Sequence, residues 1–155
     1  MRPLLLINLL FLSVISYAQD IARQRKLDAH ILSIYHGLAD IPPFATQIFC
    51  ELPPTRNQDG MPVVFSVQLD SETITPNAFA VGLSSGETVT PLCATLRPAV
   101  GSLELRTALL IGAFSPGNIV PISVEIVEEL EDVNGISLLG LKSENVTALA
   151  SGPSL

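Results

Sequence analysis

Acidic side chains gather in one short stretch of the chain, just before an Asn-Gly dipeptide. The stretch contains Glu125, Glu128, Glu129, Glu131 and Asp132. Calcium takes about six to eight oxygen ligands, and carboxylate-rich loops between strands can supply them. The spacing fits no EF-hand loop, and a run of charges is usually a solvated turn. The stretch 125–132 is therefore a candidate Ca²⁺ or small-ligand site, with an exposed turn as the simpler interpretation.

Two histidines, His30 and His36, are the other side chains that could act as acids, bases or ligands. If they lie on a helix, a separation of six residues places them on different sides of it. Neither lies in a serine or cysteine nucleophile motif, and the chain has no His-Glu-x-x-His motif. We therefore assign no catalytic and no cofactor-binding residue. A hydrolase that uses carboxylates alone stays open, because glycosidases need only two.

The two cysteines of the chain are Cys50 and Cys93. In an extended segment, Cys50 would share a face with Ile48 and Leu52, and Cys93 would share one with Val89. Both could then point into one core, and an oxidising compartment would favour joining them. We predict a Cys50–Cys93 disulfide. The alternative is two separate buried thiols that behave as small hydrophobic side chains.

The first 18 residues have the layout of a secretory signal peptide. Arg2 supplies a positive charge, the run from Leu4 to Ile15 is almost wholly apolar, and Ser16 and Ala18 provide small residues for cleavage. The apolar run is shorter than the roughly 20 residues that cross a bilayer. We therefore predict a secreted, extracellular protein that begins at Gln19 and has no membrane span.

Composition narrows the choice of partners. The chain has 15 acidic and 8 basic residues, with a net charge of −7. This balance argues against binding to nucleic acid or to anionic lipid. The chain has no tryptophan, and only Tyr35 of its tyrosines lies beyond the predicted signal peptide. Sugar binding by aromatic stacking is therefore disfavoured, and contact with another extracellular protein through an exposed sheet edge is favoured.

Short apolar segments that alternate with period two fill the rest of the chain, as expected for half-buried strands. We predict a helix within 20–38, an N-terminal arm over 19–43 and a folded body over 44–155. The fold class is an immunoglobulin-like antiparallel β-sandwich of seven or eight strands with a short helical arm. The predicted strands are 45–52, 63–69, 77–83, 88–96, 103–114, 120–127, 136–141 and 145–149.

The run from Asp59 to Leu69, followed by Ile74 to Phe79, resembles the opening of a bacterial-type immunoglobulin-like domain. In such domains, a strand that ends in an acidic residue is followed by a proline-containing turn and a phenylalanine. The stretches 91–99 and 104–112 are also similar to exported proteins of no established function. The resemblance covers roughly 59–155 and implies a sandwich fold without an activity.

These observations favour a secreted, non-enzymatic structural or protein-binding module. The first alternative is a Ca²⁺ or small-ligand module that uses the acidic turn, and the second is a carboxylate-based hydrolase. Asn145 begins an Asn-Val-Thr triplet, which predicts glycosylation in a eukaryotic host.

Overall fold

The structure is a computed structural model that describes residues 19–21, 23, 24, 28–38, 40–101 and 104–148. The predicted signal peptide over 1–18 lies outside these residues. Of the segment before residue 30, residues 19–21, 23, 24 and 28 are helical. No helix in the described part of the chain is both long and apolar enough to cross a membrane.

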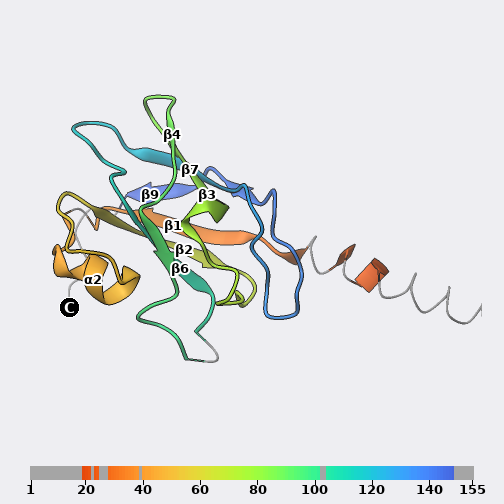
Figure 1. Cartoon of the computed structure of the whole chain (residues 1–155). Helices are drawn as coiled ribbons and strands as arrows, with labels where there is room; N and C mark the ends of the chain where they lie inside the picture. The colour runs from red at the N-terminus through yellow and green to blue at the C-terminus, as the bar shows by residue number, and fades with distance from the viewer. Residues whose placement is uncertain (1–18, 22, 25–27, 39, 102–103, 149–155) are drawn as a thin grey trace, which may run out of the picture.

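In the part of the chain that the structure describes, two sheets form the body, with five strands in the order β5-β6-β2-β1-β9 and four in the order β4-β3-β7-β8. Strands that neighbour each other are antiparallel, except that β1 and β9 run parallel. Figure 1 shows β9, β1, β2 and β6 side by side in one layer. The all-β sandwich is thus confirmed. Its elements are β1 (Ile31–His36), α2 (Phe44–Cys50), β2 (Asp59–Phe65), η1 (Pro76–Ala78), β3 (Phe79–Leu83), β4 (Thr88–Val89), β5 (Cys93–Thr95), β6 (Thr107–Gly112), β7 (Pro121–Ile126), β8 (Lys142–Ser143) and β9 (Val146–Ala148).

Alternate side chains of the strands build the core between the sheets. Val63 and Phe65 of β2 are fully buried, as are Val81 of β3 and Val124 and Ile126 of β7. Val63 and Phe65 lie at positions i and i+2 of β2, and Val124 and Ile126 do so in β7. The predicted period of two is therefore confirmed in these strands. These side chains belong to one cluster contributed by both sheets.

The helix predicted within 20–38 is wrong over 31–36, because this segment is strand β1 in the interior of the five-stranded sheet. A bulge separates Ile31, which pairs with Phe65, from Ser33, which pairs with Val64; Ile34 then pairs with Val63. The extra residue places Ile31 and Ile34 on the same face although they are three apart. That spacing imitates the period of a helix. β1 therefore adds a strand to the sheet from the segment that the sequence assigns to the arm.

The strand predicted across 45–52 is also wrong, because Phe44–Cys50 forms the short helix α2. Ala45 and Thr46 are buried, and Phe49 and Cys50 are half-buried. Their spacing is that of a helix face. Thr46 secures this helix: its Oγ1 lies 2.8 Å from the carbonyl oxygen of Pro43 and accepts a 3.0 Å hydrogen bond from the N–H of Thr55.

The single strand predicted over 88–96 is instead two edge strands in different sheets. β4 pairs with β3 and β5 pairs with β6, and Pro91 lies between them. Pro91 lies where the chain crosses from one sheet to the other, a position that suits a residue without a backbone N–H to donate. The strand predicted over 136–141 is limited to a bridge between Ser137 and Glu131. β8 follows it.

Candidate functional site

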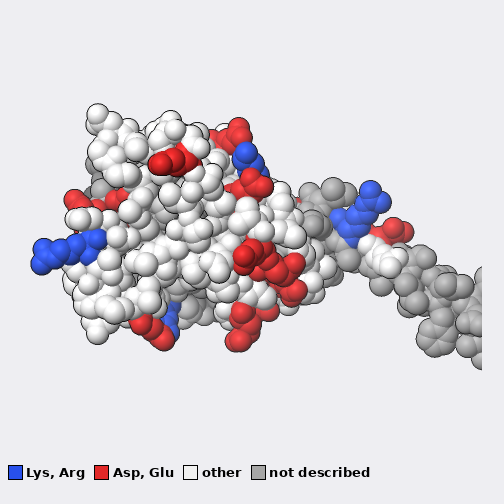
Figure 2. Space-filling view, turned by 45° about the horizontal axis from the view of Figure 1, so that its top comes forward, with Lys and Arg blue, Asp and Glu red and all other residues white. Residues whose placement is uncertain are grey.

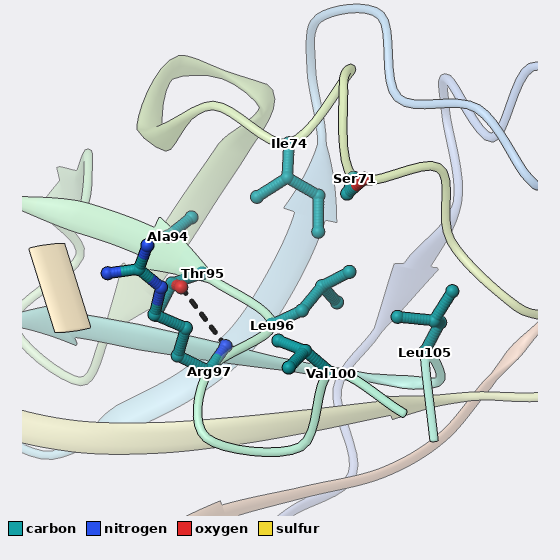
Figure 3. A pocket seen from close by; sticks show the side chains of 8 residues that line it. All are labelled: Ser71, Ile74, Ala94, Thr95, Leu96, Arg97, Val100 and Leu105. Carbon is teal, nitrogen blue, oxygen red and sulfur yellow. Dashed lines mark hydrogen bonds between the residues drawn. The ribbon is translucent and has the colours of Figure 1, made fainter. Parts of the chain in front are cut away.

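Two adjoining hollows of about 430 Å³ and about 560 Å³ lie beside β5. We call them together the edge groove. They share a set of lining residues, so they are parts of one depression. Figure 3 shows the smaller of the two hollows. The shared residues are Ser71, Ile74, Ala94, Thr95 and Arg97.

The edge groove follows the free edge of β5. Within the described part of the chain, β5 has a strand neighbour, β6, on one side only. Ala94 packs against the core, so Cys93 and Thr95 point to the opposite face of the sheet. All three residues line the groove. Side chains on opposite faces of a sheet can line the same hollow only if that hollow runs along the edge of the strand. The groove therefore lies along the edge of β5.

Apolar side chains form part of the groove wall, beside the polar Ser71, Thr95 and Arg97. Ile74 reaches it from the loop between β2 and η1, and Leu96, Val100 and Leu105 lie opposite (Figure 3). Val100 is 60% exposed. When a partner covers a solvent-exposed apolar side chain in a hollow, the burial of its surface lowers the free energy of the complex.

Arg97 joins the groove to the end of helix α2. Its Nη2 lies 2.9 Å from Oε1 of Glu51, and its Nη1 donates a 3.1 Å hydrogen bond to the carbonyl oxygen of Ile48. Its backbone N–H donates to Oγ1 of Thr95. A cation beside the last carbonyls of a helix is favourable. The arginine therefore holds one wall of the groove in place.

The disulfide between Cys50 and Cys93 holds the same wall covalently. It joins the last residue of α2 to the first residue of β5, and both cysteines line the larger hollow. The predicted pairing is thus present in the structure. Cys93 is buried and Cys50 is half-buried, but neither belongs to the main core cluster, so the pair fastens α2 beside that cluster.

The five residues of the predicted acidic site do not form one cluster. Asp132, the buried residue among the five, accepts hydrogen bonds from the backbone. Asp132 is only 4% exposed. Its Oδ1 accepts hydrogen bonds from the N–H groups of Asn134 at 2.8 Å and Ile136 at 2.9 Å. Its Oδ2 accepts one from the Asn134 amide. This carboxylate shapes the turn around Gly135.

The other four acidic residues do not gather around Asp132. Glu125 lies in β7 and pairs in register with Lys142 of β8. Glu128 and Glu129 are exposed, and Glu131 is half-buried. Among the residues that the structure describes, no group of three or more His, Cys, Asp or Glu side chains is placed to hold a metal ion.

The histidines lie apart from the edge groove. His30 is exposed just before β1, and its Nδ1 is 2.9 Å from the carbonyl oxygen of Asp28. His36 ends β1, where it pairs in register with Ala148. Neither side chain lines either hollow of the groove.

Asn145 of the Asn-Val-Thr triplet is exposed between β8 and β9. Its backbone N–H donates to Oγ of Ser143. Its glycosylation stays a prediction.

Sequence reasoning found the disulfide but missed the groove. Ile74, Arg97 and Val100 lie in connecting segments with no shared motif, and only the fold brings them together. No protein-family model, no curated protein and no solved structure matches this chain.

Proposed function

We propose that the protein is an exported, non-enzymatic β-sandwich module of the immunoglobulin-like type that binds another extracellular protein. The edge groove accepts an extended segment of that partner, which adds a strand beside β5. The sequence resemblance over roughly 59–155 to a bacterial-type immunoglobulin-like domain supports the class of module. The predicted leader over 1–18 supports export.

One observation carries the choice of surface: within the described residues, a hollow with Ile74 and Cys93 in its wall runs along the edge of β5 that has no strand neighbour. In strand addition, main-chain hydrogen bonds supply affinity, and hollows for alternate side chains supply specificity. The groove offers both features within a few residues. Ala94 and Thr95 present the strand edge, while Ile74 and Val100 present apolar surface beside it.

Peptide selection tests this function directly. Random peptides of about ten residues, long enough for one strand, are displayed and selected on the purified protein. The affinity of the selected peptides is then measured on two variants, Val100→Asp in the groove and Leu139→Asp outside it. Leu139 is a matched control because it is also exposed, at 42%, and lines neither hollow.

We expect Val100→Asp to weaken peptide binding by about tenfold or more, because a carboxylate replaces apolar contact surface. Leu139→Asp should leave binding unchanged. Hydrogen exchange at the amides of β5 should slow when a peptide is bound. Peptides that bind Val100→Asp as tightly as the original protein, with no protection in β5, would place the contact elsewhere.

A further inference from the structure

The dipeptide Asn134-Gly135 lies in an exposed turn and lines neither hollow of the edge groove. Gly135 has a φ of 74°, a left-handed backbone conformation that favours glycine. A Cβ added there would lie 3.8 Å from Oε2 of Glu131, which is an ordinary contact. The space around residue 135 is therefore open, and no side chain of its own shields its backbone nitrogen.

Asparagine is one of the chemically labile residues, and a glycine after it favours loss of the side-chain amide. The backbone nitrogen of the glycine gives its proton to solvent and attacks Cγ of the asparagine, so a new C–N bond closes a cyclic imide. The bond from Cγ to the amide nitrogen breaks, and ammonia leaves. Water then opens the imide at either carbonyl carbon and yields aspartate or isoaspartate. The net reaction consumes water, releases ammonia and replaces a neutral amide with a carboxylate.

The turn holds both reacting groups in hydrogen bonds to Asp132. The N–H of Gly135 donates to the carbonyl oxygen of Asp132 at 2.9 Å, and Nδ2 of Asn134 donates to Oδ2 of Asp132 at 3.1 Å. Both bonds have to break before the nitrogen can attack Cγ. Exposed turns open locally without global unfolding, so we expect the opening of this turn to limit the rate of the reaction.

We infer that Asn134 is a site of spontaneous deamidation, and that the reaction disrupts the turn in which it occurs. In the native turn the Asn134 amide donates to the carboxylate of Asp132, which is only 4% exposed. The product has a carboxylate at position 134, so a donor becomes an acceptor and two negative charges face each other. Isoaspartate also adds a carbon atom to the main chain, which displaces Gly135 and Ile136 relative to Asp132.

The effect extends to the segment after β2, because the turn is bonded to it. The N–H of Val133 donates to the carbonyl oxygen of Gln68 at 3.0 Å, and the N–H of Asp70 donates to that of Glu131 at 2.9 Å. Deamidation therefore converts the protein, with time, into a more acidic form in which the contact between these two segments is weakened.

An internal contrast is the dipeptide Asp59-Gly60, because an aspartate before glycine isomerises through the same imide. Gly60 is buried, and its N–H donates to the carbonyl oxygen of Leu38 at 2.9 Å. Oδ2 of Asp59 accepts hydrogen bonds from the N–H groups of Phe114 and Ser115. Both residues belong to β2, between β1 and β6. This dipeptide opens only when the sheet opens, so it should stay unmodified.

Peptide mapping by mass spectrometry tests the inference, on folded protein made in bacteria and kept for weeks at neutral pH and about 37 °C. A synthetic peptide of residues 131–137 sets the timescale. We expect the segment with Asn134 to gain the mass difference between an amide and an acid, and to take up oxygen from isotopically labelled water. It should do so before the other asparagines that the structure describes, which are exposed but precede residues with side chains. These are Asn57, Asn77, Asn118 and Asn145.

Matched variants test the two roles of the turn. Asn134→Asp mimics one product and should raise hydrogen exchange at the Ile136 amide by about tenfold or more, whereas Asn134→Ser, which keeps a donor, should change it far less. Asp132→Ala removes the acceptor of the Asn134 amide and should speed deamidation several-fold, while Glu128→Ala should not. If Asp132→Ala does not fold, the two Asn134 variants decide.

Two results would overturn the inference. One is an intact Asn134 after the synthetic peptide has fully converted, or conversion of another described asparagine or of Asp59 before it. The other is equal exchange at Ile136 in the two Asn134 variants, which would show that the new carboxylate does not disturb the turn.

Discussion

The carboxylate of Asp132 shows how a residue that resembles a metal ligand can have a local structural use. Both of its oxygens accept hydrogen bonds from the residues that follow, two from backbone N–H groups and one from the Asn134 amide. A calcium ion at this oxygen pair would have to compete with those donors. The residue is best understood as the organiser of the 132–136 turn.

Asp132→Ala should therefore lower the free energy of unfolding by about 1–3 kcal/mol, because the part-buried backbone N–H groups of Asn134 and Ile136 lose their acceptor. Glu128→Ala, an exposed carboxylate four residues earlier, should change it by less than about 0.5 kcal/mol. Urea unfolding followed by circular dichroism measures both. Equal effects of the two substitutions would mean that the hydrogen bonds of Asp132 add nothing to stability.

A second stability prediction concerns Phe65 in the core. Its side chain is fully buried between the sheets, at the position where β1 and β2 pair through Ile31. Phe65→Ala should destabilise the protein by about 3–5 kcal/mol, through lost burial and the cavity left behind. Glu129→Ala on the exposed side of the acidic stretch should cost less than about 0.5 kcal/mol. A shift of similar size from both would contradict the register of β2.

At the scale of elements, α2 is a short helix that depends on tertiary links. It has seven residues, too few to be stable in isolation. Three features hold it: the Cys50–Cys93 disulfide, the hydrogen bond from Arg97 to Ile48, and the Thr46 hydroxyl. The edge groove owes one wall to these links.

Replacing both cysteines with serine should lower the free energy of unfolding by about 2–4 kcal/mol. The amides of Phe44–Cys50 should also exchange with solvent faster, while those of the central strand β2 keep their relative protection. Hydrogen exchange with mass spectrometry gives both readouts. Unchanged exchange in α2, together with an unchanged unfolding midpoint, would show that the bridge does not anchor the helix.

The elements that the sequence predicted well are those with an undisturbed period of two. In β2 and β7, buried residues alternate with partly exposed ones, as at Val63 and Phe65 and at Val124 and Ile126. A strand with this pattern buries one face of its sheet. The bulge in β1 broke this pattern. It set Ile31 and Ile34 three apart on one face, and the spacing then favoured a helix.

The candidate site was predictable only where a pair of residues carried its own chemistry. Cys50 and Cys93 could be paired from residue type and the predicted compartment alone. Ile74, Arg97 and Val100 could not, because an isoleucine, an arginine and a valine in three connecting segments have no distinguishing spacing. Their meeting depends on how β5 lies against β6 and how α2 docks, and neither follows from local pattern.

At the scale of the molecule, charge is spread rather than focused. Figure 2 shows acidic side chains at several separate places, with basic side chains standing singly among them. Scattered charge of one sign favours solubility and opposes association. Surfaces that do associate must therefore be uncharged or locally paired. The rim of the edge groove is locally paired, because Glu51 lies 2.9 Å from Arg97.

The final prediction concerns where the folded unit begins. Strand β1 lies between β2 and β9, and Ile34 is fully buried in the core. Ala29 also belongs to the core cluster, and the backbone N–H of His30 donates to Oγ of Ser66. A chain that starts at Asp28 should therefore unfold cooperatively, as the longer protein does. A chain that starts at Pro42 should lose its transition, because removing β1 exposes the edges of two strands and opens the core.

Thermal unfolding followed by circular dichroism separates these outcomes. The variant Ile34→Ala in the longer protein serves as the graded control, since it should cost about 2–5 kcal/mol while leaving β1 in place. If the chain from Pro42 melts with the same midpoint as the chain from Asp28, then β1 is dispensable and the sandwich is complete without it. The expected result would show that β1 is an integral strand, because within the described residues it is the strand that joins β2 to β9.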